Sequence, residues 1–217
     1  MITAILLSGG VGQLMNDPTP KQYLPLGDSS SAQISYTQLH SHPRIDEIVV
    51  VCEPYYYDLF PGALFASPGL RRQDSLFNGL QKCSETTKYI LTHEATRPFL
   101  TEEDIDAIIE AGITYGAAAL ATPVKETLKQ ANSALFVTAT LNSKALYQIQ
   151  TPQVLHKEIL VAGFEKAYQD NLTVTTDVTL AELIDQPVKL VIGSTNNIKI
   201  TTPQDLNYAQ LQAAHLL

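Results

Sequence analysis

The chain has 217 residues, of which 45% are hydrophobic and 17% are charged, and its formal net charge is −8 at pH 7. This length and composition predict one globular domain over residues 1–217, with enough apolar residues for a full core. The acidic charge argues against nucleic acid or an anionic membrane as the main partner, although a local basic cluster can still bind a phosphate ligand.

The first apolar run, residues 2–7, has no Lys or Arg before it and soon meets glycines. It therefore predicts a buried strand rather than a signal peptide or a membrane span. Cys52 and Cys83 lack the spacing of a metal site, so we expect buried free thiols, with Cys52 ending a strand and Cys83 on an apolar helix face. Free thiols suit a reducing compartment, which predicts a cytoplasmic protein: bacterial cytosol, or plastid stroma after removal of a transit peptide.

Short, β-branched apolar runs predict the strands of a sheet. The runs mostly do not alternate with polar residues, which is typical of strands that are covered on both faces in a parallel sheet. These strands are expected at residues 2–7, 45–52, 88–92, 117–124 and 188–192.

Amphipathic stretches between these runs predict helices. One begins after Thr101, which is a suitable N-cap ahead of three acidic residues, another covers residues 158–168, and a third begins at Thr202-Pro203. The alternation predicts a doubly wound α/β fold, Rossmann-like, with a mostly parallel sheet. The side chains expected to face the core are Ile105, Ile108, Ile109, Ile113, Leu160, Val161, Phe164 and Ala167.

Residues 126–147 depart from this pattern. Residues 127–129 and 134–140 predict two short strands joined by a turn at 131–133. Such a hairpin has little local core to pack on, so we expect a projecting β-arm that buries its apolar face on a second copy, giving a homodimer. The alternative is an extra edge hairpin on the same domain.

A glycine-rich turn follows the first strand, with the sequence Ser8-Gly9-Gly10-Val11-Gly12. Glycines allow backbone N–H groups to approach a phosphate closely. The turn matches neither the dinucleotide fingerprint nor a Walker loop. Lys21 follows Pro20 and can fold back over the turn as a positive charge for a triphosphate; alone, it would be interpreted as a surface lysine.

The GGxG…PKQYLPL pattern resembles the opening of the 2-C-methyl-D-erythritol 4-phosphate cytidylyltransferase family. Further similar motifs follow in order over essentially the whole chain, and VVVCEPYYYDLF and QTPQVL are most similar to the plant and chlamydial branch. These motifs are RRQDS at 71–75, HEATRPF at 93–99, TPVKET at 122–127, QTPQ at 150–153, TD at 176–177 and NNIKITTP at 196–203.

The resemblance implies a nucleotidyltransferase of isoprenoid precursor biosynthesis. A phosphate oxygen of the polyol phosphate attacks the α-phosphorus of CTP and pyrophosphate leaves, with Mg²⁺ and basic side chains holding the charge. A related enzyme that acts on ribitol 5-phosphate shares the glycine turn and the PKQ and QTPQ segments. The stretches ATPVKETLK and TDVTL favour the methylerythritol substrate over this alternative.

The resemblance also implies roles for individual residues. The catalytic group would be Lys21, Lys199, Arg97 and Glu94, with Glu94 as the metal ligand. Without the resemblance, Arg97 would be interpreted as an ion-pair partner of Glu94 or Glu103, and the threonines as ordinary strand residues. The other implied contacts are Ser8, Gly9, Gly10, Gly12, Gly69, Ser75 and Ala95 to the nucleotide, and Thr127 and Thr151, together with Arg97 and Lys199, to the sugar phosphate.

Three positions depart from the family pattern. Leu14 and Ser143 stand where the family has arginines, and Glu94 stands where it has aspartate. Loss of one preorganised charge partner costs about 10²–10³ in rate, and Lys144 cannot reproduce a bidentate arginine contact. Two hypotheses follow: a working enzyme with altered charge compensation, or a catalytically impaired homologue that retains nucleotide binding.

Overall fold

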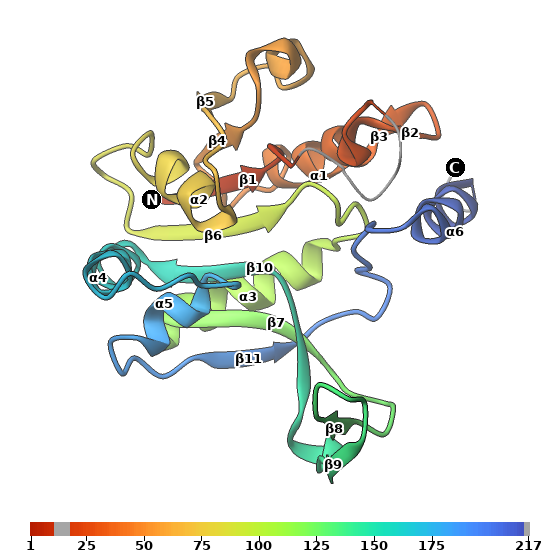
Figure 1. The fold of residues 1–217 in the computed structure, drawn as a ribbon. Helices are drawn as coiled ribbons and strands as arrows, with labels where there is room; N and C mark the ends of the chain where they lie inside the picture. The colour runs from red at the N-terminus through yellow and green to blue at the C-terminus, as the bar shows by residue number, and fades with distance from the viewer. Residues whose placement is uncertain (11–17, 215–217) are drawn as a thin grey trace.

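The computed structural model describes residues 1–10 and 18–214, and its centre is a seven-stranded sheet with the order β11-β7-β10-β6-β1-β4-β5 (Figure 1). Neighbouring strands pair in parallel except β10, which is antiparallel to both β6 and β7. The doubly wound, mostly parallel sheet is thus confirmed. Its strands are β1 (Ile2–Leu7), β4 (Glu47–Val51), β5 (Leu64–Ala66), β6 (Tyr89–Glu94), β7 (Ala117–Pro123), β10 (Tyr147–His156) and β11 (Lys189–Ile192).

Helices cover both faces of this sheet. On one face pack α1 (Ser31–His40) and α3 (Glu102–Tyr115); on the other pack α2 (Arg72–Leu80), α4 (Lys157–Gln169) and α5 (Val178–Glu182). The last helix, α6 (Pro203–Ala214), lies apart and contacts the small hairpin of β2 (Pro25–Leu26) and β3 (Ser29–Ser30).

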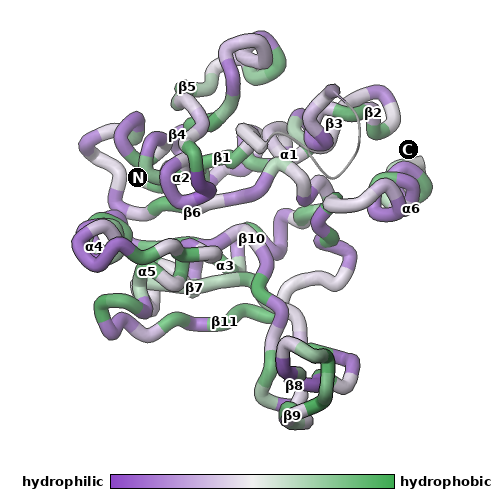
Figure 2. Tube along the Cα trace, viewed as in Figure 1, coloured by the Kyte–Doolittle hydropathy of each residue, from purple (hydrophilic) through white to green (hydrophobic). Residues whose placement is uncertain are grey.

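The first strand shows why its apolar residues do not alternate with polar ones. Ala4 and Leu6 belong to the hydrophobic cluster beneath α1 and α3, whereas Ile5 belongs to the cluster beneath α2 and α4. All three side chains are fully buried. A strand that is covered on both faces has apolar residues at every position, and Figure 2 shows mostly hydrophobic residues along β1 and β4.

Two residues predicted to face the core, Ile113 of α3 and Val161 of α4, are instead 40% and 37% exposed. In each helix a glycine takes the inward position. A Cβ on Gly112 would lie 2.2 Å from a methyl of Val154, and a Cβ on Gly163 would lie 2.4 Å from a carbonyl oxygen of α5. This close approach leaves room only for glycine, so Gly112 and Gly163 hold the places nearest the packed neighbour. The other predicted inward residues are buried: Ile105, Ile108, Ile109, Leu160, Phe164 and Ala167.

The predicted arm is confirmed as a projecting hairpin. Its strands, β8 (Lys129–Ala131) and β9 (Val137–Thr140), pair antiparallel and extend away from the body of the protein (Figure 1). Three successive side chains at its tip, Leu135, Phe136 and Val137, are 86%, 71% and 61% exposed. Exposure of apolar side chains to water is unfavourable, which is a physical reason to expect that the tip is covered by a second copy. The role of the arm in dimerisation stays a prediction.

Both cysteines are free, as predicted, but only Cys52 is buried. The prediction that Cys83 lies on a helix face is wrong, because α2 ends at Leu80 and Cys83 follows it, half-buried. Its thiol lies 3.4 Å from the Gly79 carbonyl oxygen. Within residues 1–10 and 18–214, no helix has the length and apolar character needed to span a membrane.

Candidate active site

The carboxyl ends of β1 and β6 form a crevice. From β1 the chain continues to β4 on one side of it and later returns to β6 on the other side, and ligands of doubly wound sheets bind at such switch points. A cavity of about 340 Å³ opens there. It is lined by Leu7, Gly9, Gly10, Lys21, Gln22, Gly69, Leu70, Arg71, Arg72, Ser75, Glu94, Thr96 and Lys199.

Most of the predicted nucleotide contacts therefore meet in one cavity. Ser8 and Ala95 are buried and do not line it, while Gly12 and Leu14 lie outside the described residues. The Ser75 hydroxyl accepts a hydrogen bond from the Gly69 N–H at 2.9 Å, so these two predicted cytosine contacts hold each other in place.

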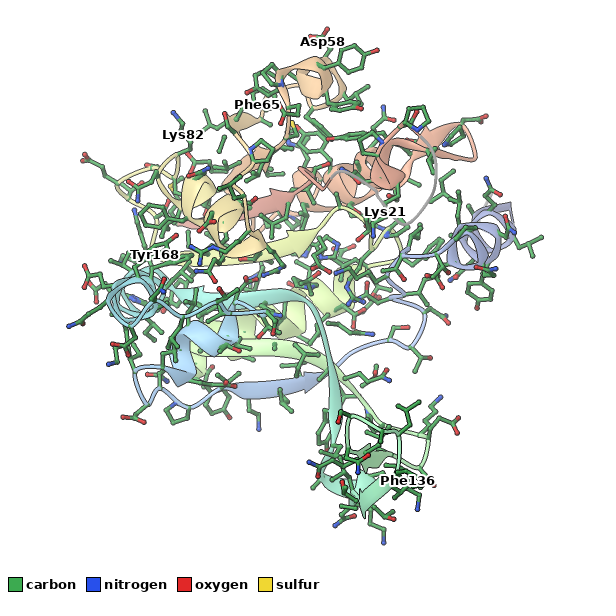
Figure 3. All side chains as sticks on the ribbon, viewed as in Figure 1. Lys21, Asp58, Phe65, Lys82, Phe136 and Tyr168 are labelled. Carbon is green, nitrogen blue, oxygen red and sulfur yellow. The ribbon has the colours of Figure 1, made fainter. Side chains whose placement is uncertain are left out.

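Lys21 belongs to a single 3-10 turn, η2 (Lys21–Tyr23), beside the glycines that follow β1. Burial lowers the pKa of its ammonium group, and the positive charge of Lys199 lowers it further. Figure 3 shows Lys21 at the carboxyl end of the central strands and Lys82 at the opposite end of the molecule. The cavity is locally electropositive although the whole chain is acidic, and a phosphate ligand would relieve that repulsion.

Glu94, the last residue of β6, is the anion at the centre of this positive cluster. Its Oε1 lies 2.9 Å from Lys199 Nζ and 3.1 Å from Arg72 Nε, and its Oε2 lies 3.4 Å from Arg97 Nε. Burial acts to raise the pKa of this carboxyl, but the attraction of the three cations outweighs burial and lowers the pKa to about 2. Glu94 is thus ionised at neutral pH, and the ion pair expected for Arg97 is present.

Arg72 is a cavity residue that sequence reasoning missed. Besides Glu94, it pairs with the buried Asp177 through two hydrogen bonds, Nη1 to Oδ1 and Nη2 to Oδ2, the latter at 3.0 Å. Asp177 is in turn held by Gln153 Oε1, which accepts from the N–H groups of Asp177 and Val178 at 2.9 Å each. The adjacent arginines at the start of α2, Arg71 at its N-cap and Arg72 at its first position, were the sequence signal, because both acidic partners of Arg72 are remote in sequence.

Thr151, which was predicted to contact the sugar phosphate, is 3% exposed and is hydrogen-bonded to the backbone of Glu94. Its hydroxyl oxygen accepts from the Glu94 N–H at 3.0 Å. His93 Nε2 donates to the Arg97 carbonyl at 3.0 Å, so Nδ1 accepts from the Thr151 hydroxyl at 3.2 Å. Burial lowers the pKa of His93 to about 4, which keeps the ring neutral. The hydroxyl of Thr151 is therefore already hydrogen-bonded to two groups of β6, the Glu94 N–H and the His93 ring.

A second cavity of about 380 Å³ adjoins the first, and Lys199 lines both. Arg97 contributes to this second cavity, where its Nη1 donates to the Asn197 carbonyl at 2.8 Å. Thr127 and Ser143 lie on the arm and line neither cavity. The remaining lining residues are Thr122, Gln148, Ile149, Gln150, Thr195, Asn197 and Ile198.

A glycine turn, two lysines and two arginines around one carboxylate, at the switch point of a doubly wound sheet, define a nucleotidyltransferase of the α/β class. The sequence model of one such family, 2-C-methyl-D-erythritol 4-phosphate cytidylyltransferase, matches residues 2–214. The chain belongs to this family.

Relatives and solved structures agree with this assignment. The chloroplastic 2-C-methyl-D-erythritol 4-phosphate cytidylyltransferase of rice is 42% identical over 217 residues, covering 96% of this chain and 73% of the rice protein. The Chlamydia pneumoniae enzyme of the same name is 41% identical over 208 residues, covering 95% and 96%. The expected similarity to plant and chlamydial proteins is thus confirmed.

Among solved structures, 4-diphosphocytidyl-2C-methyl-D-erythritol synthase from Anaerococcus prevotii has a TM-score of 0.88 at 29% identity, covering 98% of this chain and 96% of that one. The cytidylyltransferase from Thermus thermophilus has a TM-score of 0.82 at 26% identity, covering 97% and 98%. The similarity therefore extends over the whole fold, including the arm-bearing half.

Proposed function

We propose that this chain transfers the cytidylyl group of CTP to 2-C-methyl-D-erythritol 4-phosphate and releases pyrophosphate. The observation that carries the proposal is the pair of adjoining cavities that share Lys199. The first has the glycine turn and Lys21 for a triphosphate, and the second has Arg97 for the acceptor phosphate. A substrate in each would bring both phosphates to the same lysine.

The proposed chemistry needs positioned positive charge rather than a covalent intermediate. As the acceptor oxygen attacks the α-phosphorus, negative charge increases on the α-phosphate and on the departing pyrophosphate. Lys21 and Lys199 would stabilise that charge from the first cavity, and Arg72, oriented by Asp177, would add a third cation. Arg97 would hold the acceptor phosphate in line from the second cavity.

We propose Mg²⁺ as the metal, because it would be held mainly by substrate phosphates with one protein carboxylate. Across the described residues, no group of three or more His, Cys, Asp or Glu side chains could hold a metal ion. Mg²⁺ is commonly bound by one or two carboxylates together with substrate phosphates, and Glu94 offers such a carboxylate in the first cavity. The metal would neutralise phosphate charge there. Glu94 is about 1.5 Å longer than the aspartate of the family pattern.

We propose further that the arm makes a homodimer and brings Thr127 to the second cavity of its partner. Support comes from the exposed apolar tip and from the position of Thr127, which lines neither cavity of its own chain. Burial of apolar surface on a second copy contributes about 25 cal/mol per Å².

The arm prediction is tested with Phe136→Ser combined with Leu135→Ser. We expect this double variant to sediment as a monomer at micromolar concentration while the wild type sediments as a dimer, because the apolar contact is lost. Tyr55→Ser is the matched control, since Tyr55 is 87% exposed on the body of the protein. A wild type that sediments as a monomer would contradict the proposal.

The function is tested by pyrophosphate release from CTP with each of two acceptors. We expect release with 2-C-methyl-D-erythritol 4-phosphate and none above background with ribitol 5-phosphate; the reverse would favour the alternative substrate.

The departures from the family pattern at Leu14 and Ser143 call for a second test, of whether the chain turns CTP over at all. If calorimetry shows CTP binding without turnover, the chain is an impaired homologue, and Leu14→Arg with Ser143→Arg should restore release. Absence of CTP binding would overturn both hypotheses, the working enzyme and the impaired homologue that retains nucleotide binding.

A further inference from the structure

Gln22 follows Lys21, also lines the first cavity and is 2% exposed, although it has a polar side chain. Its Nε2 donates to two carbonyl oxygens of the glycine turn, that of Ser8 and that of Gly10, each at 2.8 Å. One carboxamide thus connects the 3-10 turn that carries Lys21 to the loop that lines the first cavity. The chemistry proposed above gives Gln22 no role.

The neighbouring side chain makes the same connection. The Tyr23 hydroxyl donates to the Ser8 carbonyl at 3.0 Å and accepts from the Ser8 hydroxyl at 2.8 Å. Its ring stacks on Tyr56, with 3.5 Å between ring centroids and an interplanar angle of 7°. The carbonyl of Gln22 itself accepts from Ser31 Oγ at 3.2 Å. The turn is therefore anchored both to α1 and to the residues beyond β4.

These contacts determine which way the Ser8–Gly9 peptide faces. In a trans peptide the carbonyl and the following N–H point in opposite directions. With the Ser8 carbonyl directed at Gln22 and Tyr23, the Gly9 N–H points to the other side. Gly9 carries no side chain, and only glycine fits, because a Cβ there would lie 2.5 Å from Pro68 Cγ. The cavity therefore meets bare backbone at Gly9.

We propose that Gln22 is the positioning residue of the triphosphate site: it holds the carbonyls of Ser8 and Gly10 away from the cavity and fixes Lys21 beside them. The inference rests on the proposed role of this turn in binding CTP. Without the two N–H···O bonds, the Ser8 carbonyl would keep only the Tyr23 hydroxyl as a side-chain donor, and the Gly10 carbonyl, on an exposed residue, would lose this donor. The Gly10 carbonyl could then rotate toward the cavity, where its oxygen would repel phosphate.

The first test compares Gln22→Met with the wild type. Methionine has a similar volume but no donor, so we expect the Kd for CTP, measured by calorimetry, to rise about 10- to 100-fold. The matched control is Gln38→Met, because Gln38 Nε2 also donates to a carbonyl, that of Pro98 at 2.8 Å, but does not line this cavity. The control should stay within about twofold of the wild type.

The second test uses pH to separate positioning from simple packing. In Gln22→Glu the introduced carboxyl faces two carbonyls, so its pKa should be raised, and only its protonated form can donate a hydrogen bond. We expect the variant-to-wild-type ratio of CTP Kd values to fall as the pH drops from about 8 to about 6. This comparison also decides the question if Gln22→Met does not fold, as checked by far-ultraviolet circular dichroism.

The outcomes separate this inference from the proposed function. If the wild type binds CTP and Lys21→Ala weakens binding while Gln22→Met does not, the positioning role of Gln22 is wrong and the site stands. A Kd ratio for Gln22→Glu that does not change with pH would also overturn it. If the wild type does not bind CTP at all, the proposed function and the inference fail together.

Discussion

Replacing Lys21 with alanine is expected to lower kcat for pyrophosphate release by about 10²–10³-fold. Lys21 and Lys199 both line the cavity beside the glycine turn, so two positive charges converge there. Burial lowers the pKa of Lys21, and the charge of Lys199 lowers it further. A triphosphate would bind between charges that are already in position. Because the charge of the phosphates increases in the transition state, the loss should appear in kcat as well as in the Kd for CTP.

Lys82→Ala is the matched control for this experiment. Lys82 is exposed and lies at the far end of the molecule from Lys21 (Figure 3), so its removal should leave kcat within about twofold of the wild type. Steady-state kinetics at saturating CTP, together with a thermal melt, separate loss of activity from loss of folding. A Lys21→Ala variant with wild-type kcat would contradict the catalytic role of this lysine.

Glu94→Gln is expected to reduce the free energy of unfolding at neutral pH by about 3 kcal/mol, because it leaves Lys199, Arg72 and Arg97 around an uncharged side chain in a largely buried position. The pH dependence should change as well. Glu94 has its pKa lowered from 4.5 to about 2 in the folded protein. Its contribution to stability is therefore complete above the unfolded value of 4.5 and is lost as the pH falls toward about 2.

The measurement is urea unfolding of both proteins at several pH values across that window. The wild type should lose more stability than Glu94→Gln as the pH falls, so the two curves should converge in acid. Asp205, whose pKa is also lowered to about 2, should give both proteins the same remaining acid dependence. Glu158→Gln serves as control, since that side chain is 91% exposed. Parallel curves for the wild type and Glu94→Gln would contradict the charge network.

Local sequence patterns were sufficient to predict the main strands of the central sheet. The strands at residues 2–7 and 117–123 were predicted closely because a strand covered on both faces has apolar residues at every position. Gly9, Gly10 and Lys21 line one cavity, as their predicted role requires, and they were recognised because they lie within a short stretch of sequence. The family motifs, which follow one another in the expected order, indicated the family, but they did not predict the contacts of individual residues.

The strand β10 was missed, although it lies in the middle of the sheet. Its sequence contains Gln150 and Gln153, which interrupt the apolar pattern. In the structure both are buried and bonded to remote backbone: Gln150 donates to the Ser194 carbonyl at 3.1 Å, and Gln153 accepts from the N–H of Asp177. A buried polar side chain needs hydrogen-bond partners, so its burial can be predicted only when those partners are known. Here the partners are more than twenty residues away in sequence.

The sequence by itself therefore determined the α/β class, the glycine turn after the first strand and the lysine that belongs to it, because each is a local pattern with a local physical cause. Only the tertiary structure decided what surrounds Glu94. The carboxylate pairs with Arg72 and Lys199, which are 22 and 105 residues away in sequence, and the Thr151 hydroxyl accepts a hydrogen bond from its backbone N–H. The pair with Arg97, only three residues away, was the part that the sequence predicted. Charges as far apart in sequence as those of Glu94 and Lys199 meet only when the sheet brings its strand ends together, so no local pattern could reveal them.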